Sequence, residues 1–455
     1  MSAINAFDDA PLSRFHKRLA VFTAGGPFLD GYILSIIGVA MVQLAPEFDM
    51  SPSTQGLVGA AALIGIFFGA FVGGWATDKL GRHLLFTIDL IALVVCSVAQ
   101  GLVNDVGWLI ALRFLVGIAV GADYPIATSL LAEFTPRRYR GKLLGAFVTT
   151  WFLGAATAYV VGQFLLHVDG GWRWMLASAA LPGLVIVIAR MGTPESPRWL
   201  AKNGREDEAL EVIHKVYGEH VTLHDLQEAD QAETQEHVGL RALVSAGYGK
   251  RMAFITIFWT CSIVPLFAVY AFSPAILSAL NLGDDLAHIG SAAITVLFLV
   301  GCLVAVGLVE RMGRRPLIIH SFLWSGVALL ALGLFPHAAP VVILALFATY
   351  AVLIGGTQIL QWVYPNELFP TEIRGSAVGL ASSLSRIGAA VGTYLVPVAL
   401  SGIGIGPTML LGGLITLVGA AVSLAWAPET RGKTLAECAS LTTTTAVGTV
   451  AKAVS

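Results

Sequence analysis

The chain has 455 residues, of which 56% are hydrophobic and 12% are charged, and its mean hydropathy is +0.77. So little charge cannot cover the surface of a water-soluble protein of this length, which excludes a soluble globular domain and predicts an integral membrane protein. The net charge of −2 provides no basic surface for a nucleic-acid partner.

Twelve apolar runs lie between Leu19 and Trp426, each close to the roughly 20 residues that a helix needs to cross a bilayer. Six precede a polar stretch at 193–250 and six follow it. We expect spans at 19–44, 55–76, 84–103, 106–132, 142–166, 172–192, 253–281, 288–310, 316–335, 340–365, 376–401 and 406–427. An even number of spans places both termini on one side of the membrane.

The distribution of Lys and Arg residues indicates which side of the membrane faces the cytoplasm. Of the 27 Lys and Arg residues, all except Arg113, Arg173 and Arg386 fall in the terminal segments or in the loops after spans 2, 4, 6, 8 and 10, including the near end of span 6. Short positively charged loops stay in the cytoplasm. We therefore expect both termini to be cytoplasmic and the protein to cross the plasma (inner) membrane many times. The first apolar run is too long for the core of a cleaved signal and is expected to be a retained span.

The expected organisation has four parts: an N-terminal six-helix bundle at 1–192, a cytoplasmic helical linker at 193–250, a C-terminal six-helix bundle at 251–435 and a disordered cytoplasmic tail at 436–455. The linker repeats apolar residues at helical spacing between charges, which predicts short interfacial helices. The four cysteines have neither CxxC spacing nor nearby His ligands, so we expect packing residues and no metal site.

Three motifs occur twice, about half a chain apart. Their copies are E-x-x-P-x-x-x-R-G at 133–141 and 367–375, [DE]-x-x-G-R at 78–82 and 310–314, and P-E-[ST] at 194–196 and 428–430. Duplicated halves in an apolar chain predict a transporter that works by alternating access.

The loop at 74–83 resembles the G-x-x-x-D-x-x-G-R-[RK] loop of the major facilitator superfamily, with His83 in place of the final basic residue. The chain most resembles the sugar-porter branch, and the resemblance covers nearly all of it. The matching motifs are RFLVG at 113–117, PESPRWL at 194–200, WVYPNELFP at 362–370 and PETRG at 428–432, whereas GADYP at 121–125 is similar to phosphate and organic-acid:proton symporters.

This resemblance implies an all-α membrane protein with twelve transmembrane helices in two pseudo-symmetric six-helix bundles. It implies a bacterial inner-membrane metabolite:proton symporter with the proton as coupling ion and no other cofactor. The implied partners are a small-molecule substrate and the lipid bilayer, with a monomer as the working unit. No P-loop, G-x-S-x-G or H-E-x-x-H motif is present, so we do not expect an enzyme.

The repeated loops are the expected conformational gate. In relatives, their acidic and basic residues form a charge lattice that holds one conformation, and carboxylate–guanidinium pairs at the water boundary can separate in another state at modest cost. By resemblance, the gate consists of Asp78, Arg82, Glu133, Arg140, Glu195, Arg198, Glu310, Arg314, Glu367, Arg374, Glu429 and Arg431.

Ionisable residues inside spans are energetically expensive and are therefore candidates for proton coupling. The resemblance implies that Asp30 and Arg113 form a coupling pair whose separation favours proton uptake. The alternative for this pair is a static ion pair that orients two helices. Asp123 is a second candidate for the protonated residue. Asp89 lies in span 3, which the resemblance places at the periphery, so a structural role is expected there.

The substrate site departs from the sugar-porter pattern. Sugar-binding members carry a Gln after a Gly in span 5 and a Gln pair in span 7, whereas this chain has Ala155 after Gly154 and no Gln at 261–264. Missing amides leave sugar hydroxyls without partners, so a standard hexose site is not expected. Ile33, where aromatic-acid transporters carry a second Asp, argues against that class and against phosphate. The candidate contacts are Tyr124, Gln163, Tyr270, Gln358, Gln361, Trp362 and Arg386.

Arg386 lies deep in span 11, and a guanidinium facing the cavity favours a carboxylate. The alternative is an Arg that reaches a backbone carbonyl or lipid head groups. We expect proton-driven uptake of a small polar solute, with a sugar acid or other monocarboxylate first and a neutral sugar second. The competing hypotheses are a uniporter or exporter of the same fold without proton coupling, and a membrane nutrient receptor that does not transport.

Overall fold

The computed structural model describes residues 11–80, 82–135, 137–219, 221–224, 248–280, 284–369, 371–433 and 438. The first half contains α1 (Arg14–Glu47), α2 (Pro52–Leu80), α3 (Arg82–Leu102), α4 (Val106–Phe134), α5 (Arg137–Leu165), α6 (Gly171–Ser178) and α7 (Ala180–Arg190), followed by α8 (Pro197–Lys202) and α9 (Glu206–Tyr217). The second half contains α12 (Gly249–Ala279), α13 (Asp284–Met312), α14 (Arg314–Leu334), α15 (Pro340–Leu368), α16 (Thr371–Gly402) and α17 (Ile405–Trp426).

Eleven membrane-length apolar segments are found in the described part of the chain, and the 29-residue α5 completes twelve spans. The expected sixth span is broken at Ala179 into α6 and α7. Pro182 explains the break, because it has no N–H group to bond the carbonyl of Ser178 one turn earlier. The break does not change the number of crossings.

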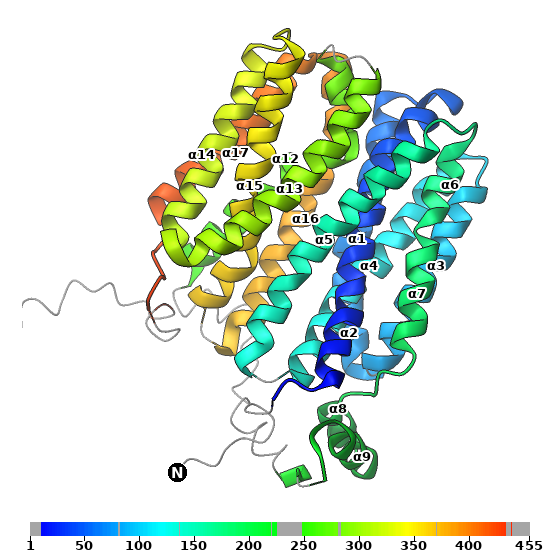
Figure 1. Cartoon of the computed structure of the whole chain (residues 1–455), viewed down its shortest axis with the longest axis vertical. Coiled ribbons are helices and arrows are strands. Elements are labelled where there is room, and N and C mark those ends of the chain that lie inside the picture. The colour runs from blue at the N-terminus through cyan, green and yellow to red at the C-terminus, as the bar shows by residue number, and fades with distance from the viewer. Residues whose placement is uncertain are drawn as a thin grey trace, which may run out of the picture.

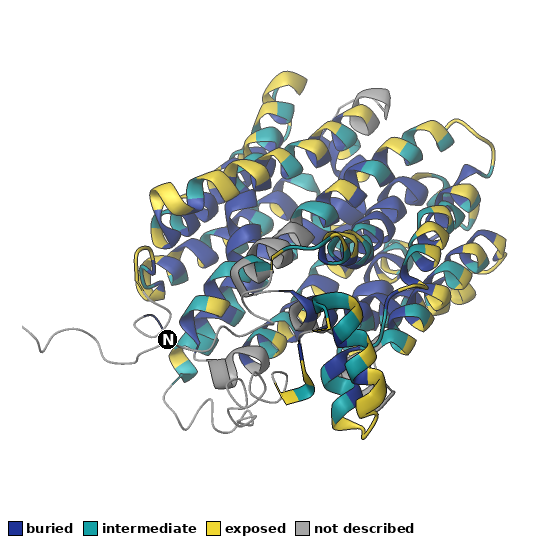
Figure 2. Cartoon of the chain, turned by 60° about the horizontal axis from the view of Figure 1, so that its bottom comes forward, coloured by how far each residue is buried: buried dark blue, intermediate teal, exposed yellow. Residues whose placement is uncertain are grey.

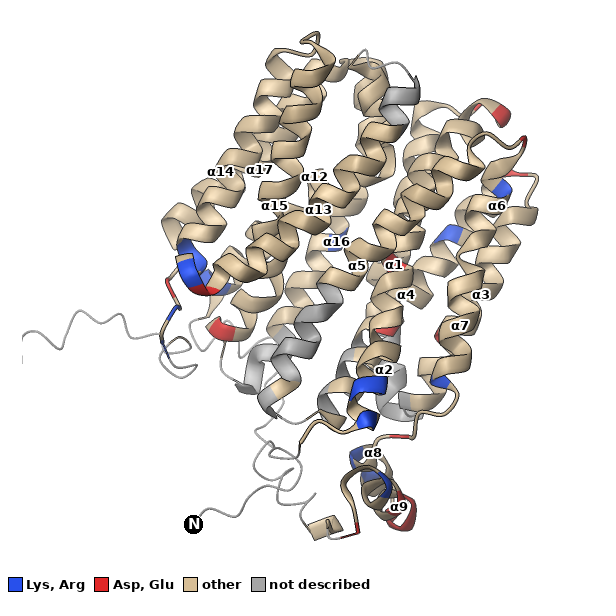
Figure 3. Cartoon of the chain, viewed as in Figure 1, with Lys and Arg blue, Asp and Glu red and all other residues tan. Residues whose placement is uncertain are grey.

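The helices form two bundles that lie side by side, with α1–α7 in one and α12–α17 in the other (Figure 1). We call the end at which α1 begins and α17 ends the terminus side, and the opposite end the far side. The short helices α8 and α9 lie beyond the first bundle on the terminus side. Charged residues are concentrated at the helix ends and are sparse along the middle of the bundles (Figure 3).

Burial follows the pattern of a membrane protein. Buried residues lie in the interior of the bundles and exposed residues lie on the outside (Figure 2). Many of the exposed residues are large and apolar. On α3, for example, Leu84, Ile88, Ile91 and Val95 are each about half exposed and recur at helical spacing. Such a stripe faces lipid, because large contiguous apolar patches are rare on monomeric water-soluble proteins.

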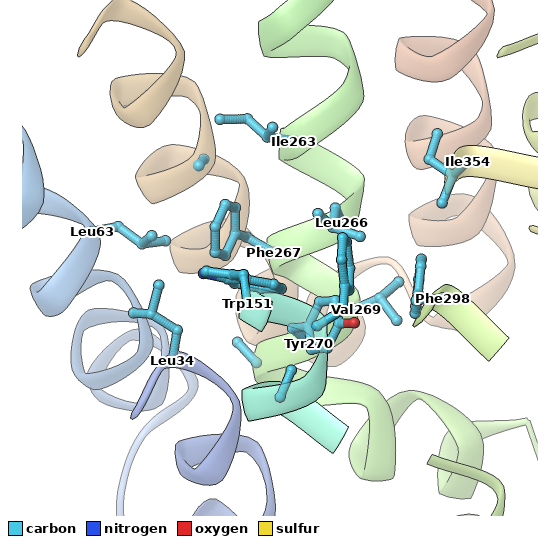
Figure 4. Close-up of a cluster of buried hydrophobic side chains, with 14 of the residues drawn as sticks. Leu34, Leu63, Trp151, Ile263, Leu266, Phe267, Val269, Tyr270, Phe298 and Ile354 are labelled. Atoms are coloured by element: carbon cyan, nitrogen blue, oxygen red, sulfur yellow. The ribbon is translucent and has the colours of Figure 1, made fainter. Parts of the chain in front are cut away.

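An aromatic cluster joins the two bundles near their centre. The rings of Phe267 and Tyr270 on α12 meet the ring of Trp151 on α5 edge to face, with centroids 5.8 and 5.4 Å away (Figure 4). Phe298 of α13 packs on Tyr270 at 5.1 Å. This cluster forms a floor between the centre of the molecule and the far side.

Beyond this floor, the bundles are closed on the far side. Pro274 has no N–H group, which leaves the carbonyl of Tyr270 without its partner in the helix. The hydroxyl of Tyr159 on α5 donates to that carbonyl at 2.7 Å and lies 3.0 Å from the hydroxyl of Ser273. The sequence of α12 therefore creates an acceptor that the opposite bundle satisfies.

Replacing Tyr159 by Phe should loosen this closure. One lost hydrogen bond is worth about 1 kcal/mol, which corresponds to about a fivefold smaller preference for the closed far side. The measurement is the labelling rate, by a membrane-impermeant thiol reagent, of a cysteine introduced at Thr393, whose side chain is 1% exposed and lies beside Gly59 of the other bundle. Tyr350→Phe is the matched control, because the buried Tyr350 hydroxyl has no partner among the described residues. Equal rates in both variants would contradict this account.

Candidate functional site

The duplicated motifs form the same contact in both bundles. The Glu195 carboxylate accepts from the backbone N–H of His83 at 3.0 Å, at the start of α3. The Glu429 carboxylate accepts from the N–H groups of Arg314 and Arg315 at 3.0 and 3.1 Å, at the start of α14. A carboxylate satisfies the free N–H groups of a helix N-terminus and interacts favourably with the helix dipole. The sequence repeat is therefore also a structural repeat.

The second bundle also contains a charge network. The Arg314 guanidinium bonds Glu310 at 2.9 Å and Glu367 at 2.8 Å, and the Thr430 hydroxyl donates to Glu367. Burial raises the pKa of Glu429, but hydrogen bonds from four backbone N–H groups outweigh it and hold that pKa below its ordinary value. These contacts join helices of one bundle.

The remaining gate candidates are placed as follows. Arg431 donates to the carbonyl of Arg311 at 2.6 Å, and Arg198 lies half-buried on α8. The side chains of Asp78, Arg82, Glu133, Arg140 and Arg374 lie outside the described residues. The gating role of the whole set stays a prediction.

A narrow cavity of about 50 Å³ lies between the bundles at mid-depth. It has room for only a few water molecules, at about 10–15 Å³ for each, so side chains must move before a sugar-sized solute fits. Its lining combines an aromatic wall with two amides and one guanidinium, contributed by Tyr124, Trp151, Phe152, Ile263, Leu266, Phe267, Gln358, Gln361, Trp362 and Arg386.

Five predicted contacts, Tyr124, Gln358, Gln361, Trp362 and Arg386, line this cavity, whereas Gln163 and Tyr270 do not. Gln163 is half-buried near the far-side end of α5. Tyr270 is almost fully buried in the aromatic floor, which Figure 4 shows beside Trp151.

Ser262 orders the two amides. The side-chain N–H groups of Gln358 and Gln361 donate to its hydroxyl at 2.7 and 2.8 Å, and the Thr357 hydroxyl lies 2.7 Å from the same atom. This hub on α12 occupies the segment in which the sequence lacks the usual Gln pair. The sequence does not predict it, because an isolated Ser in an apolar span has no motif that marks it as an acceptor for two distant amides.

Asp30 adjoins the cavity through two of its lining residues. The Tyr124 hydroxyl and the Trp151 indole N–H both donate to Asp30 Oδ2 at 2.7 Å. Asp30 is 1% exposed, and its Oδ1 has no partner among the described residues. One oxygen is thus held in place while the other is available for a proton. Sequence reasoning missed Trp151, since nothing local links it to a residue 121 positions earlier.

The structure does not join Arg113 to Asp30. Arg113 Nε donates to the carbonyl of Val58 on α2 at 2.8 Å, and neither terminal nitrogen has a partner among the described residues. Asp30 lies at the level of Tyr124, which is eleven residues, or about 16 Å, further along α4 than Arg113. Each residue therefore has separate neighbours in this conformation, and the coupling pair stays a prediction.

Asp123 is bound to an arginine that the sequence did not single out. Arg190 Nη1 lies 2.7 Å from Asp123 Oδ1, and the two side chains are 0% and 7% exposed. The Arg190 guanidinium also lies 3.5 Å from the centre of the Phe86 ring. Arg190 lies at the end of the sixth span, where the sequence alone does not distinguish it from the charges of the adjoining loop.

Asp89 lies on the inner face of α3, whose outer face is peripheral as expected. Its side chain is buried and lines a second, smaller cavity together with Asp30, Asp123 and Tyr124. The opposite face of α3 carries the lipid-facing apolar stripe, which explains how one helix serves both environments.

Arg386 lies inside the molecule. Its guanidinium is 5.4 Å from the centre of the Phe267 ring and lines the central cavity beside Trp362. It has no hydrogen bond or ion pair to another residue in the described part of the chain, yet it interacts electrostatically with Asp30. One guanidinium and one carboxylate therefore share this central region.

Residues 19–441 match the family described as sugar (and other) transporter. The YaaU protein of Escherichia coli (strain K12) is 44% identical to this chain, with 96% of this chain and 97% of YaaU covered. The inner membrane metabolite transport protein YgcS of the same organism is 40% identical, with 93% and 94% covered.

Among solved structures, the xylose transporter XylE from E. coli, in a partially occluded inward open conformation, superposes with a TM-score of 0.80. It shares 23% identity, and the match covers 93% of this chain and all of XylE. The expected two-bundle, twelve-helix fold is thereby confirmed. The chain belongs to the sugar (and other) transporter family of the major facilitator superfamily, and it is a membrane transporter, not an enzyme.

Proposed function

We propose that this transporter couples proton entry to uptake of a small polar solute, with a monocarboxylate such as a sugar acid as the preferred class. The observation that carries the proposal is Arg386, a guanidinium that lines the central cavity without an ion-pair partner among the described residues. Such a group binds a carboxylate through charge-assisted hydrogen bonds.

Asp30 is the proposed coupling residue. When it is ionised, its charge is attracted to Arg386 and competes with an anionic solute for the guanidinium. When Asp30 binds a proton at its unpartnered Oδ1, Arg386 is left to the solute carboxylate. Proton and monocarboxylate then cross together without net charge in the cavity, which avoids the cost of an unpaired charge at mid-membrane.

We propose that the terminus side is cytoplasmic and that the membrane is the inner membrane of a bacterium. The distribution of Lys and Arg over the loops supports this orientation. The closed far side then faces outward. The repeated acidic contacts at α3 and α14 lie on the cytoplasmic side, as a gate controlling inward release requires.

A neutral sugar is the second candidate, and the family description favours it. The Gln358 and Gln361 amides, ordered by Ser262, can bond hydroxyl groups. A sugar acid would use both features, with its hydroxyl groups at the amides and its carboxylate at Arg386.

Binding of carboxylates should raise the apparent stability of the purified protein, because a ligand that binds only the native state stabilises it. A thermal-shift screen would compare gluconate, glucuronate and other small monocarboxylates with glucose and xylose. Replacing Arg386 by Gln should weaken carboxylate binding about tenfold or more by removing charge-assisted bonds. The same replacement should leave the thermal shift caused by neutral sugars unchanged.

The control is Arg205→Gln, which removes a guanidinium paired with Glu208 on the exposed face of α9 and should leave all shifts unchanged. If only neutral sugars stabilise the protein, the assignment of Arg386 to the substrate is wrong.

A further inference from the structure

The second cavity is lined by three carboxylates. It has a volume of about 10 Å³, roughly the space of one water molecule, and its acidic lining residues are Asp30, Asp89 and Asp123. Tyr124 lines both this cavity and the central one. The coupling residue therefore adjoins the substrate cavity on one side and an acidic chamber on the other.

Among the residues that the structure describes, Arg190 is the one whose guanidinium bonds to a carboxylate of this chamber. The described charged and titratable groups around Asp89 are Asp30 of α1, Asp123 and Tyr124 of α4, and Arg190 of α7. Arg190 is bound to Asp123. Asp89 Oδ1 accepts from the N–H group of Leu90 at 2.7 Å, and Oδ2 accepts from no N–H or O–H group of the described residues. The Asp89 side chain is within hydrogen-bonding reach of the Asp123 carboxylate.

Asp89 and Asp123 are two buried carboxylates, and Arg190 can neutralise the charge of only one of them. If both were ionised, one negative charge would be left without compensation. An unpaired buried charge is costly, so the pair binds a proton instead of keeping both charges. Because Arg190 stabilises the ionised form of Asp123, the proton belongs on Asp89. The Asp89 carboxyl group can donate this proton to the Asp123 carboxylate, and both side chains line the chamber.

The chamber lies between Asp30 and the terminus side. A Cβ atom added at Gly26, one helical turn before Asp30, would lie 1.6 Å from Asp123 Oδ2. The Asp123 carboxylate thus fills the space beside that glycine. Arg190 is the last residue of α7, at its terminus-side end. The ion pair is therefore about 6 Å closer to the terminus side than Asp30, measured along α1.

We propose that Asp89 is a second proton-binding residue, through which a proton leaves Asp30 for the terminus side, with Arg190 and Asp123 as its fixed ion pair. This inference rests on the proton coupling proposed above. Asp89 releases its proton to solvent on the terminus side and then accepts the proton of Asp30 through a water in the chamber. Asp89 is then protonated again and Asp30 is left ionised, so the net result is the transfer of one proton from Asp30 to the terminus-side solvent, and no other reactant is needed.

The direct test is infrared difference spectroscopy between acidic and alkaline pH on the full protein in lipid. Asp89→Asn should remove one protonated-carboxyl band that Asp30→Asn retains. Ser97→Ala is the control on α3, because its buried hydroxyl is not part of the chamber. A spectrum of Asp89→Asn identical to that of the unmodified protein overturns the inference.

If Asp89→Asn lowers the melting temperature too far for measurement, Asp89→Glu decides instead. The longer side chain should shift the frequency of the same band, and an unshifted band counts against the proposal. In vesicles, Asp89→Asn should reduce accumulation driven by a one-unit pH gradient from about tenfold to about equal concentrations, while solute exchange at equal pH continues.

The two levels of proposal can fail separately. If Asp30→Asn abolishes driven accumulation and Asp89→Asn does not, the second proton site is wrong and the coupling proposal stands. If Asp30→Asn leaves accumulation intact, the coupling role of Asp30 is wrong, and the infrared bands still decide whether Asp89 binds a proton.

Discussion

Asp30→Asn should abolish accumulation of the solute against its gradient. One proton per solute and one unit of pH difference support about tenfold accumulation, and the variant should reach only equal concentrations on both sides. Asparagine cannot exchange a proton, but its oxygen can still accept from Tyr124 and Trp151. Exchange of labelled for unlabelled solute at equal pH should therefore survive.

The measurement uses vesicles of the reconstituted protein, with a carboxylate found in the thermal-shift screen as solute. Asp105→Asn is the matched control, because that acid caps the far-side start of α4 and is remote from the cavity. Accumulation that survives in both Asp30→Asn and Asp123→Asn would show that transport is not coupled through these acids. It would favour the uniporter or exporter hypothesis.

Gly154→Ala should produce the second large effect, a loss of stability together with a loss of coupling. A Cβ atom at Gly154 would lie 1.9 Å from the Phe28 carbonyl oxygen, and one at Gly31 would lie 1.9 Å from that of Trp151. Helices α1 and α5 thus touch backbone to backbone, as small residues permit in membranes. Overpacking costs about 1–3 kcal/mol, and pushing the helices apart would stretch the Trp151–Asp30 hydrogen bond.

The repeat provides a control. Gly388 corresponds to Gly154 at the 234-residue offset, but a Cβ atom there would meet methyl groups of Thr260 and Val264 instead of backbone. Gly388→Ala should therefore lower the melting temperature less. Gly307→Ala, which meets nothing within 4 Å, should be neutral or slightly stabilising. Equal losses in all three variants would contradict the role assigned to the close helix contact.

The sequence could predict the spans, the duplication and much of the cavity lining, because length, hydropathy and motif order are local properties. It could not predict which side chains meet across helices. The contacts of Asp30 with Trp151 and of Asp123 with Arg190 join residues 121 and 67 positions apart. These contacts depend on the rotation of each helix about its axis and on its position along the membrane normal. Neither quantity can be inferred from a sequence motif.

Asp89 shows that the rotation of a helix about its axis also decides whether a residue faces lipid or the protein interior. Its helix was expected to be peripheral, and one face of α3 does face lipid, but the acid lies on the other face. Gln163 and Tyr270 are polar residues on helices that contribute to the cavity, yet neither side chain lines it, and both lie towards the far side. Residue type therefore identifies candidate cavity residues. The depth of each residue in the membrane and the rotation of its helix determine which of them line the cavity.

The acidic contacts at α3 and α14 have a consequence for how the chain can be divided. Glu195 and Glu429 each bond a helix of their own bundle, so neither half needs the other for this contact. A break in the polypeptide between α9 and α12 should therefore yield two fragments that each assemble their own six helices. When co-produced, the fragments should associate and restore transport, although no covalent bond connects them.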